Sequence, residues 1–139
     1  MDLSKTKIKD LPESMQKKID CSNSLQLELE GFKLISKAFE ITVEKLQAYS
    51  RPPKRAINIA TEELELYQRL LQNTEESLKL VANKEQTYVE YLLAVEKLTR
   101  EKKEIFEEIV ESNSKCLSSL KFFNANLRMN PHLPEGAFE

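Results

Sequence analysis

Residues 54–129 decide the fold, and they read KRAINIATEELELYQRLLQNTEESLKLVANKEQTYVEYLLAVEKLTREKKEIFEEIVESNSKCLSSLKFFNANLRM. The chain has two glycines and five prolines, and all seven lie outside this stretch. A β-sandwich or β-barrel needs many turns, and turns depend on these two residue types. Charged residues make up 32% of the chain and aromatic residues 7%, which is typical of long helices and coiled coils. The sequence therefore predicts an all-α fold.

The same stretch carries an apolar series that advances alternately by three and four residues from Ile57 to Leu127. Five positions of this series are polar, namely Thr74, Glu85, Thr99, Lys102 and Asn113. A 3.5-residue repeat that continues beyond three or four heptads is typical of a coiled coil. We therefore expect a helical seam along the whole stretch.

Two prolines separate this long region from an earlier helical one. Pro52 and Pro53 lack the backbone N–H that would continue a helix, so they predict a sharp turn at residues 50–53. We expect a helix over about residues 12–49 before that turn. The polar residues 21–24 leave open a break within it.

The domain organisation that follows is simple, because 139 residues suit a single domain. Residues 12–129 are expected to form one helical domain of the coiled-coil or bundle kind. Residues 1–11 are expected to form a flexible N-terminal segment, and residues 130–139 an extended C-terminal tail.

The two helical regions differ too much in length to cover one another, since they would span about 57 Å and about 110 Å at 1.5 Å per residue. The long region is either one continuous helix in an antiparallel hairpin or coiled coil, or it breaks near Glu85, where Asn83 and Gln86 can form a cap, to give a three-helix antiparallel bundle. Matched segment lengths favour the bundle. The unbroken register favours the continuous helix, which is our first expectation.

A continuous long helix would leave its second half without a cover inside the chain. We expect a protein partner to cover that half, as a homodimer or as a hetero-oligomeric coiled coil. The candidate interface residues are Leu92, Val95, Phe106, Ile109, Cys116, Leu120, Phe123 and Leu127.

Residue types that carry catalysis or bind metals are sparse. His132 is the single histidine, and Cys21 and Cys116 lie far apart, so no zinc-ligand spacing exists. Two glycines cannot build a phosphate-binding glycine loop. We therefore expect no enzymatic activity, no cofactor and no metal site.

Net charge and hydropathy bear on which partners the chain can bind and on where in the cell it is expected. The chain has 23 acidic and 21 basic residues and a net charge of −2, which does not indicate nucleic-acid binding. Its longest apolar run, Tyr91–Val95, is far shorter than the ~18 residues of a membrane span. The N-terminus lacks the apolar core of a secretory signal, so we expect a cytoplasmic protein with reduced thiols.

Two features suggest contact with a membrane surface. Arg51, Lys54 and Arg55 flank the proline turn and are candidates for contact with anionic lipid. The stretch 76–103 contains Glu76-Ser77-Leu78-Lys79, Tyr88, Glu90, Tyr91, Val95-Glu96, Leu98-Thr99 and Lys103. In these residues it resembles the curved-membrane-binding helical domain of sorting nexins. That resemblance implies a helical domain that binds membranes peripherally.

The sequence as a whole predicts a non-catalytic protein–protein interaction module, a scaffold or adaptor subunit that assembles through heptad seams into an oligomer. Two alternatives stay open. One is a peripheral membrane-binding helical domain of the curved BAR-like kind, and the other is a small helical secretion or assembly chaperone.

Overall fold

The regular structure is all-helical, as predicted. A computed structural model describes the backbone of residues 2–20 and 22–129, and the side chains of residues 2–20 and 23–115. Within these residues the only extended pairing is an isolated antiparallel bridge between Lys7 and Thr87. The helices, in chain order, are the 3-10 helix η1 (Ile8–Asp10), α1 (Glu13–Ile19), α2 (Ser22–Gln47), α3 (Lys54–Ala82) and α4 (Tyr88–Met129).

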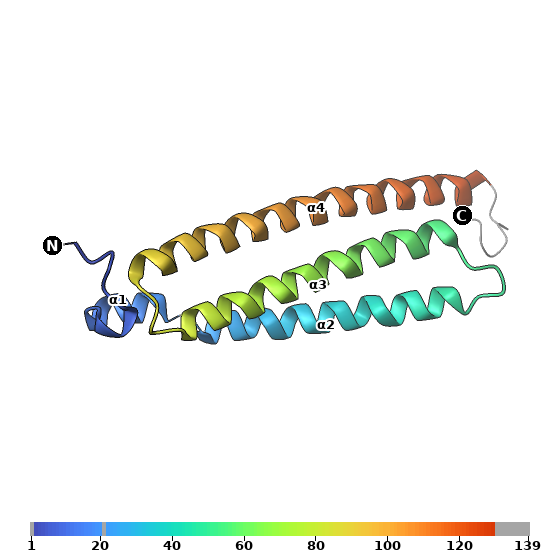
Figure 1. Ribbon diagram of the computed structural model, residues 1–139. Coiled ribbons are helices and arrows are strands. Elements are labelled where there is room, and N and C mark those ends of the chain that lie inside the picture. The colour runs from blue at the N-terminus through green and yellow to red at the C-terminus, as the bar shows by residue number, and fades with distance from the viewer. Residues whose placement is uncertain (1, 21, 130–139) are drawn as a thin grey trace.

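Each of the three long helices runs antiparallel to the one before it, and α3 packs against both α2 and α4 (Figure 1). The predicted alternative of a three-helix antiparallel arrangement is therefore confirmed. Our first expectation, a continuous helix from residue 54 to residue 129, is wrong, because α3 ends at Ala82 and α4 begins at Tyr88.

Side-chain hydrogen bonds cap the end of α3 and the start of α4, where no glycine or proline is present to break the helix. Gln86 donates its Nε2–H to the Leu80 carbonyl at 2.7 Å, which satisfies a carbonyl of the last turn of α3. The Asn83 side-chain oxygen accepts the backbone N–H of Glu85 at 3.2 Å and closes a local turn. The predicted capping role of Asn83 and Gln86 thus explains how the register is interrupted.

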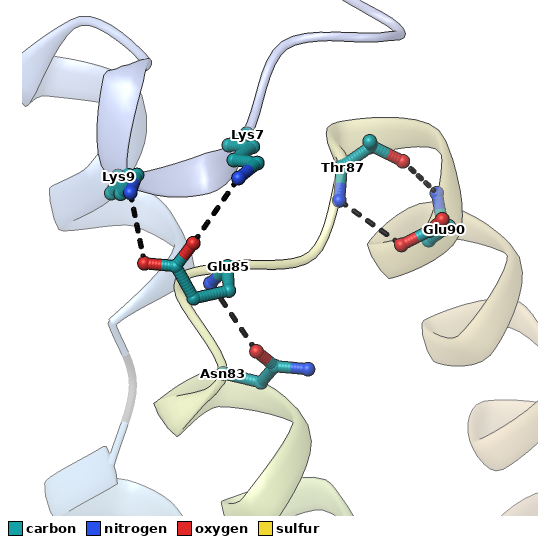
Figure 2. A network of polar contacts seen from close by, with 6 residues as sticks. All are labelled: Lys7, Lys9, Asn83, Glu85, Thr87 and Glu90. Carbon is teal, nitrogen blue, oxygen red and sulfur yellow. Dashed lines mark hydrogen bonds and ion pairs between the residues drawn. The ribbon is translucent and has the colours of Figure 1, made fainter.

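A capping box begins α4. The Thr87 hydroxyl accepts the Glu90 backbone N–H at 3.3 Å, and the Glu90 carboxylate accepts the Thr87 backbone N–H at 3.2 Å (Figure 2). Such a Thr-x-x-Glu pair satisfies two N–H groups that a helix start leaves open. This motif was not predicted, although its Thr-x-x-Glu spacing is visible in the sequence.

One of the other two breaks lies in the polar run, where the sequence left a break open, and the other lies at the predicted proline turn. α1 ends at Ile19 and α2 begins at Ser22, within the polar run. At the proline turn α2 ends at Gln47, and the Pro53 carbonyl accepts the Ile57 N–H at 2.9 Å as α3 begins. Proline is tolerated here because the first helical turn needs no donor from it.

The core shows why a single heptad series could not account for all the buried apolar residues of α3. Phe39 of α2 stacks on Tyr67 of α3, with ring centroids 5.6 Å apart, on the side that the predicted series marks. On the α4 side, Leu66 and Leu70 form a buried cluster with Ile105 and Ile109. Leu66 and Leu70 lie outside the predicted series. A helix between two neighbours needs apolar residues toward both of them, and the series accounts for only one.

Candidate interaction surfaces

The predicted interface residues of α4 divide between the core and the surface. Ile109 is 5% exposed and packs on Leu66 and Leu70 of the same chain. Val95 is half-buried, while Leu92 and Phe106 are 46% and 40% exposed. The backbone of Cys116, Leu120, Phe123 and Leu127 lies in α4, and their side chains lie outside the described residues.

Polar contacts fill the rest of the α3–α4 interface. The buried Ser112 hydroxyl lies 3.2 Å from the Glu63 carboxylate, and the Asn73 side chain donates to the Leu98 carbonyl at 3.0 Å. Burial raises the pKa of Tyr67, and the Glu63 charge raises it further. Exposed ion pairs, Arg69 with Glu108 and Glu62 with Lys115, flank this interface. The inner face of α4 is therefore already occupied by α3.

A second contact joins α4 to α2. Lys102 donates to Glu28 at 2.9 Å, and both side chains are partly buried. Beside this pair the rings of Phe32 and Phe106 lie 6.4 Å apart. These contacts cover one flank of α2.

Another face of α2 is apolar and uncovered by the described residues. Leu27 is 70% exposed, Leu34 is 74% exposed and Ile41 is 40% exposed. The three residues are spaced by seven, so they lie on one side of the helix. On this side of the helix, the small residues Gly31 and Ala38 lie between the three large ones. A Cβ added at Gly31 would meet no atom of the described residues within 4 Å outside its chain neighbours and its own helix backbone. We define the outer α2 face as Ser24, Leu27, Gly31, Leu34, Ala38 and Ile41.

This face was not predicted, because only one apolar seam was identified in residues 12–49. The signal is a second series with alternating steps of four and three, offset from the inner seam that contains Leu29, Phe32 and Phe39. The described exposures separate the two series, since Leu29 is buried and Leu34 is not.

Charged side chains border the outer α2 face. Glu30, Lys37 and Glu44 are exposed and lie along one edge at seven-residue spacing. Lys37 meets Glu40 of the same helix at 3.7 Å, an exposed pair of little energetic weight.

The predicted anionic-surface residues lie at the turn between α2 and α3. Arg51, Lys54 and Arg55 are all exposed. Tyr49, two residues after the end of α2, is 47% exposed. The turn between α2 and α3 lies at one end of the helical assembly, so these three residues lie at that end (Figure 1).

The N-terminal residues 2–11 pack on the connection between α3 and α4, a contact that the sequence analysis did not predict. Ile8 donates its N–H to the Gln86 carbonyl at 3.0 Å, and Tyr88 donates to the Thr6 carbonyl at 2.8 Å. Ile8 and Leu11 are buried with Ile19, and Tyr88 and Tyr91 pack against them. This segment therefore holds the start of α4 against α1.

Glu85 adds an electrostatic contact to the same place. Its carboxylate accepts hydrogen bonds from Lys9 at 2.9 Å and from Lys7 at 3.3 Å (Figure 2). The hydrogen bond from Lys9, followed by the one from Lys7, lowers the pKa of Glu85 below its ordinary 4.5. The same contact raises the pKa of Lys9. The polar residue that interrupts the predicted seam is thus an exposed partner of the N-terminal segment.

We expect Glu85→Gln to lower the melting temperature slightly at neutral pH and to have no effect in acid. A carboxylate with a lowered folded-state pKa stabilises the fold above its unfolded-state pKa, and that contribution is lost as pH falls through the folded-state pKa. Melting curves of both proteins should therefore converge once the pH falls below the lowered folded-state pKa of Glu85. Because the pair is exposed, ~1 M salt should also reduce the difference. A difference that persists unchanged in acid would contradict this assignment.

The described part of the chain offers no cluster of metal-binding side chains. Among those residues no group of three or more His, Cys, Asp or Glu side chains could hold a metal ion. The described helices include none that is both long enough and apolar enough to cross a membrane. Comparison with protein-family models, with curated proteins and with solved structures found no match to the chain.

Proposed function

We propose that this chain is a non-catalytic protein–protein interaction module that binds a helical partner through the outer α2 face. One observation carries the proposal: Leu27, Leu34 and Ile41 are exposed in a row along a well-formed helix whose opposite side is packed. Isolated exposed apolar residues are ordinary, but a contiguous row with heptad spacing is typical of a helix that pairs with another.

Burial of the outer α2 face would supply a substantial part of the free energy of binding. Complete burial of a leucine or isoleucine side chain contributes roughly 1.5–3 kcal/mol. Three such side chains, together with the helix surface around them, are enough to offset part of the cost of association, which is about 4–15 kcal/mol. Contributions from a partner's own side chains supply the rest. The proposed role is that of a scaffold or adaptor subunit.

Affinity capture from the native source with three versions of the chain tests this function. Leu34→Glu places a charge in the centre of the outer α2 face, and we expect it to abolish capture of a protein that the unmodified chain binds. Leu93→Glu is the matched control, because Leu93 is 67% exposed on α4. Circular dichroism should show that both variants are helical. If both variants retained every captured protein, the proposal would fail.

A second candidate function rests on the exposed cations Arg51, Lys54 and Arg55 at the proline turn. Each basic residue near an anionic bilayer contributes about 1 kcal/mol to binding. If the chain binds membranes through this turn, it should sediment with anionic vesicles at low salt, and a variant with all three residues changed to glutamate should not. Absence of binding to such vesicles would remove this candidate.

A further inference from the structure

We propose that the partner of the outer α2 face is the same face of a second copy, with the two α2 helices antiparallel and Gly31 of each opposite Leu34 of the other. This proposal rests on the proposed function and specifies its partner. Three independent features of α2 support it: the order of large and small residues, the space at Gly31, and the charges along one edge.

Large and small residues alternate along the outer α2 face. Leu27, Leu34 and Ile41 occupy one set of seam positions, and Ser24, Gly31 and Ala38 occupy the other. When two copies run antiparallel, each position of one set lies opposite a position of the other set. A large side chain then meets a small one at every layer, which gives interdigitated packing without voids. In a parallel pair large residues would meet large ones, and glycine would meet glycine.

Gly31 fits this arrangement. A glycine inside a helix costs about 1 kcal/mol relative to alanine. Apart from its two chain neighbours and the backbone of its own helix, no atom of the described chain lies within 4 Å of the place that a Cβ would take at Gly31, so no packing contact within one copy requires the missing side chain. In the proposed dimer, Leu34 of the second copy lies directly opposite Gly31. The absence of a Cβ at Gly31 makes room for this leucine and lets the two helix backbones approach closely.

The charged edge selects the register. With Gly31 opposite Leu34, Glu30 of one copy lies beside Lys37 of the other, and symmetry produces this pair twice. A slide of one heptad in one direction places Glu30 beside Glu44 and Lys37 beside Lys37. A slide in the other direction places Glu30 beside Glu30. Like charges disfavour both alternatives. Side-chain size therefore favours the antiparallel orientation, and charge complementarity selects one register within it.

The mass in solution tests the proposal first. Sedimentation equilibrium of the purified chain should give twice the 16.1 kDa mass of one chain. Glu30→Lys alone and Lys37→Glu alone should each weaken dimerisation about tenfold, because each creates like-charge contacts. The double variant, which exchanges the charges, should recover most of the lost affinity. A monomeric unmodified chain, or a double variant weaker than both single variants, would overturn the proposal.

Disulfide cross-linking then tests the register. In a background in which Cys21 and Cys116 are serine, Glu30→Cys mixed with Lys37→Cys should form a covalent dimer under mild oxidation. Neither variant alone should form one. A dimer from Lys37→Cys alone or from Glu30→Cys alone would show a shifted register and contradict the proposal.

The two proposals fail in distinguishable ways. If the purified chain is monomeric but Leu34→Glu still abolishes capture of a different protein, the proposed function stands and the self-association is refuted. If the chain is monomeric and Leu34→Glu changes no capture, the outer α2 face has no partner and both are refuted.

Discussion

Replacement of Leu70 by alanine is expected to lower the free energy of unfolding by about 3 kcal/mol. Leu70 is completely buried and belongs to the cluster that joins α3 to α4 through Ile105 and Ile109. Truncation removes buried methyl groups and leaves a cavity that long, laterally packed helices fill only partly. Urea denaturation followed by circular dichroism, at one fixed chain concentration, measures the change.

Leu93→Ala is the matched control, because it removes the same atoms from a side chain that is 67% exposed. We expect this variant to change the free energy of unfolding by less than about 0.5 kcal/mol. Equal effects of the two substitutions would mean that Leu70 does not lie in a core between α3 and α4.

Replacement of Ile8 by alanine is expected to cost about 2 kcal/mol and to loosen the start of α4. Ile8 is completely buried, and its cluster includes Tyr88 and Tyr91 of the first turn of α4. We expect faster amide hydrogen exchange over residues 84–91 in the variant, with little change in the centre of α3. Lys5→Ala, at an exposed position of the same segment, should leave exchange unaltered. Unchanged exchange in Ile8→Ala would refute the structural role of the N-terminal segment.

The fold class could be predicted from the sequence because the helical signals are repeated along the chain. Glycine and proline are absent from residues 54–129, and the apolar series keeps its period throughout. The turn at Pro52 and Pro53 and the helix break near Ser22 can also be explained by the local residue types. The break near Glu85 could not be decided in this way, because the caps that stop α3 and start α4 are side-chain hydrogen bonds within an unbroken pattern.

The candidate surface was harder to predict than the fold. A heptad series shows that a helix has an apolar face, but it does not show which neighbour covers that face. Once α4 folds back, Ile109 is covered by Leu66 and Leu70, so this predicted interface residue lies inside the chain. Leu92 and Phe106 of α4 stay partly exposed. Leu27 and Leu34 of α2, which were not predicted as interface residues, are exposed in a row. Coverage is a property of the tertiary arrangement and is not visible in a single helix.

The reversal of the chain between Ala82 and Tyr88 is the central claim, because it determines which face remains uncovered. The Glu62 Oε1 atom of α3 lies 3.9 Å from the Lys115 Nζ atom of α4, and both residues are exposed. Spin labels at these two positions, in a chain with both cysteines replaced by serine, report their separation by pulsed electron paramagnetic resonance. Dilution with unlabelled protein restricts the measurement to distances within one chain.

Adjacent helix axes are about 8–10 Å apart, so the labels should lie within about 30 Å of one another. A continuous helix through residues 83–87 would separate the same labels by about 80 Å at 1.5 Å per residue. A distribution centred on the shorter distance is the result that we predict, and a distribution centred on the longer one would contradict the fold and the assignment of the outer α2 face.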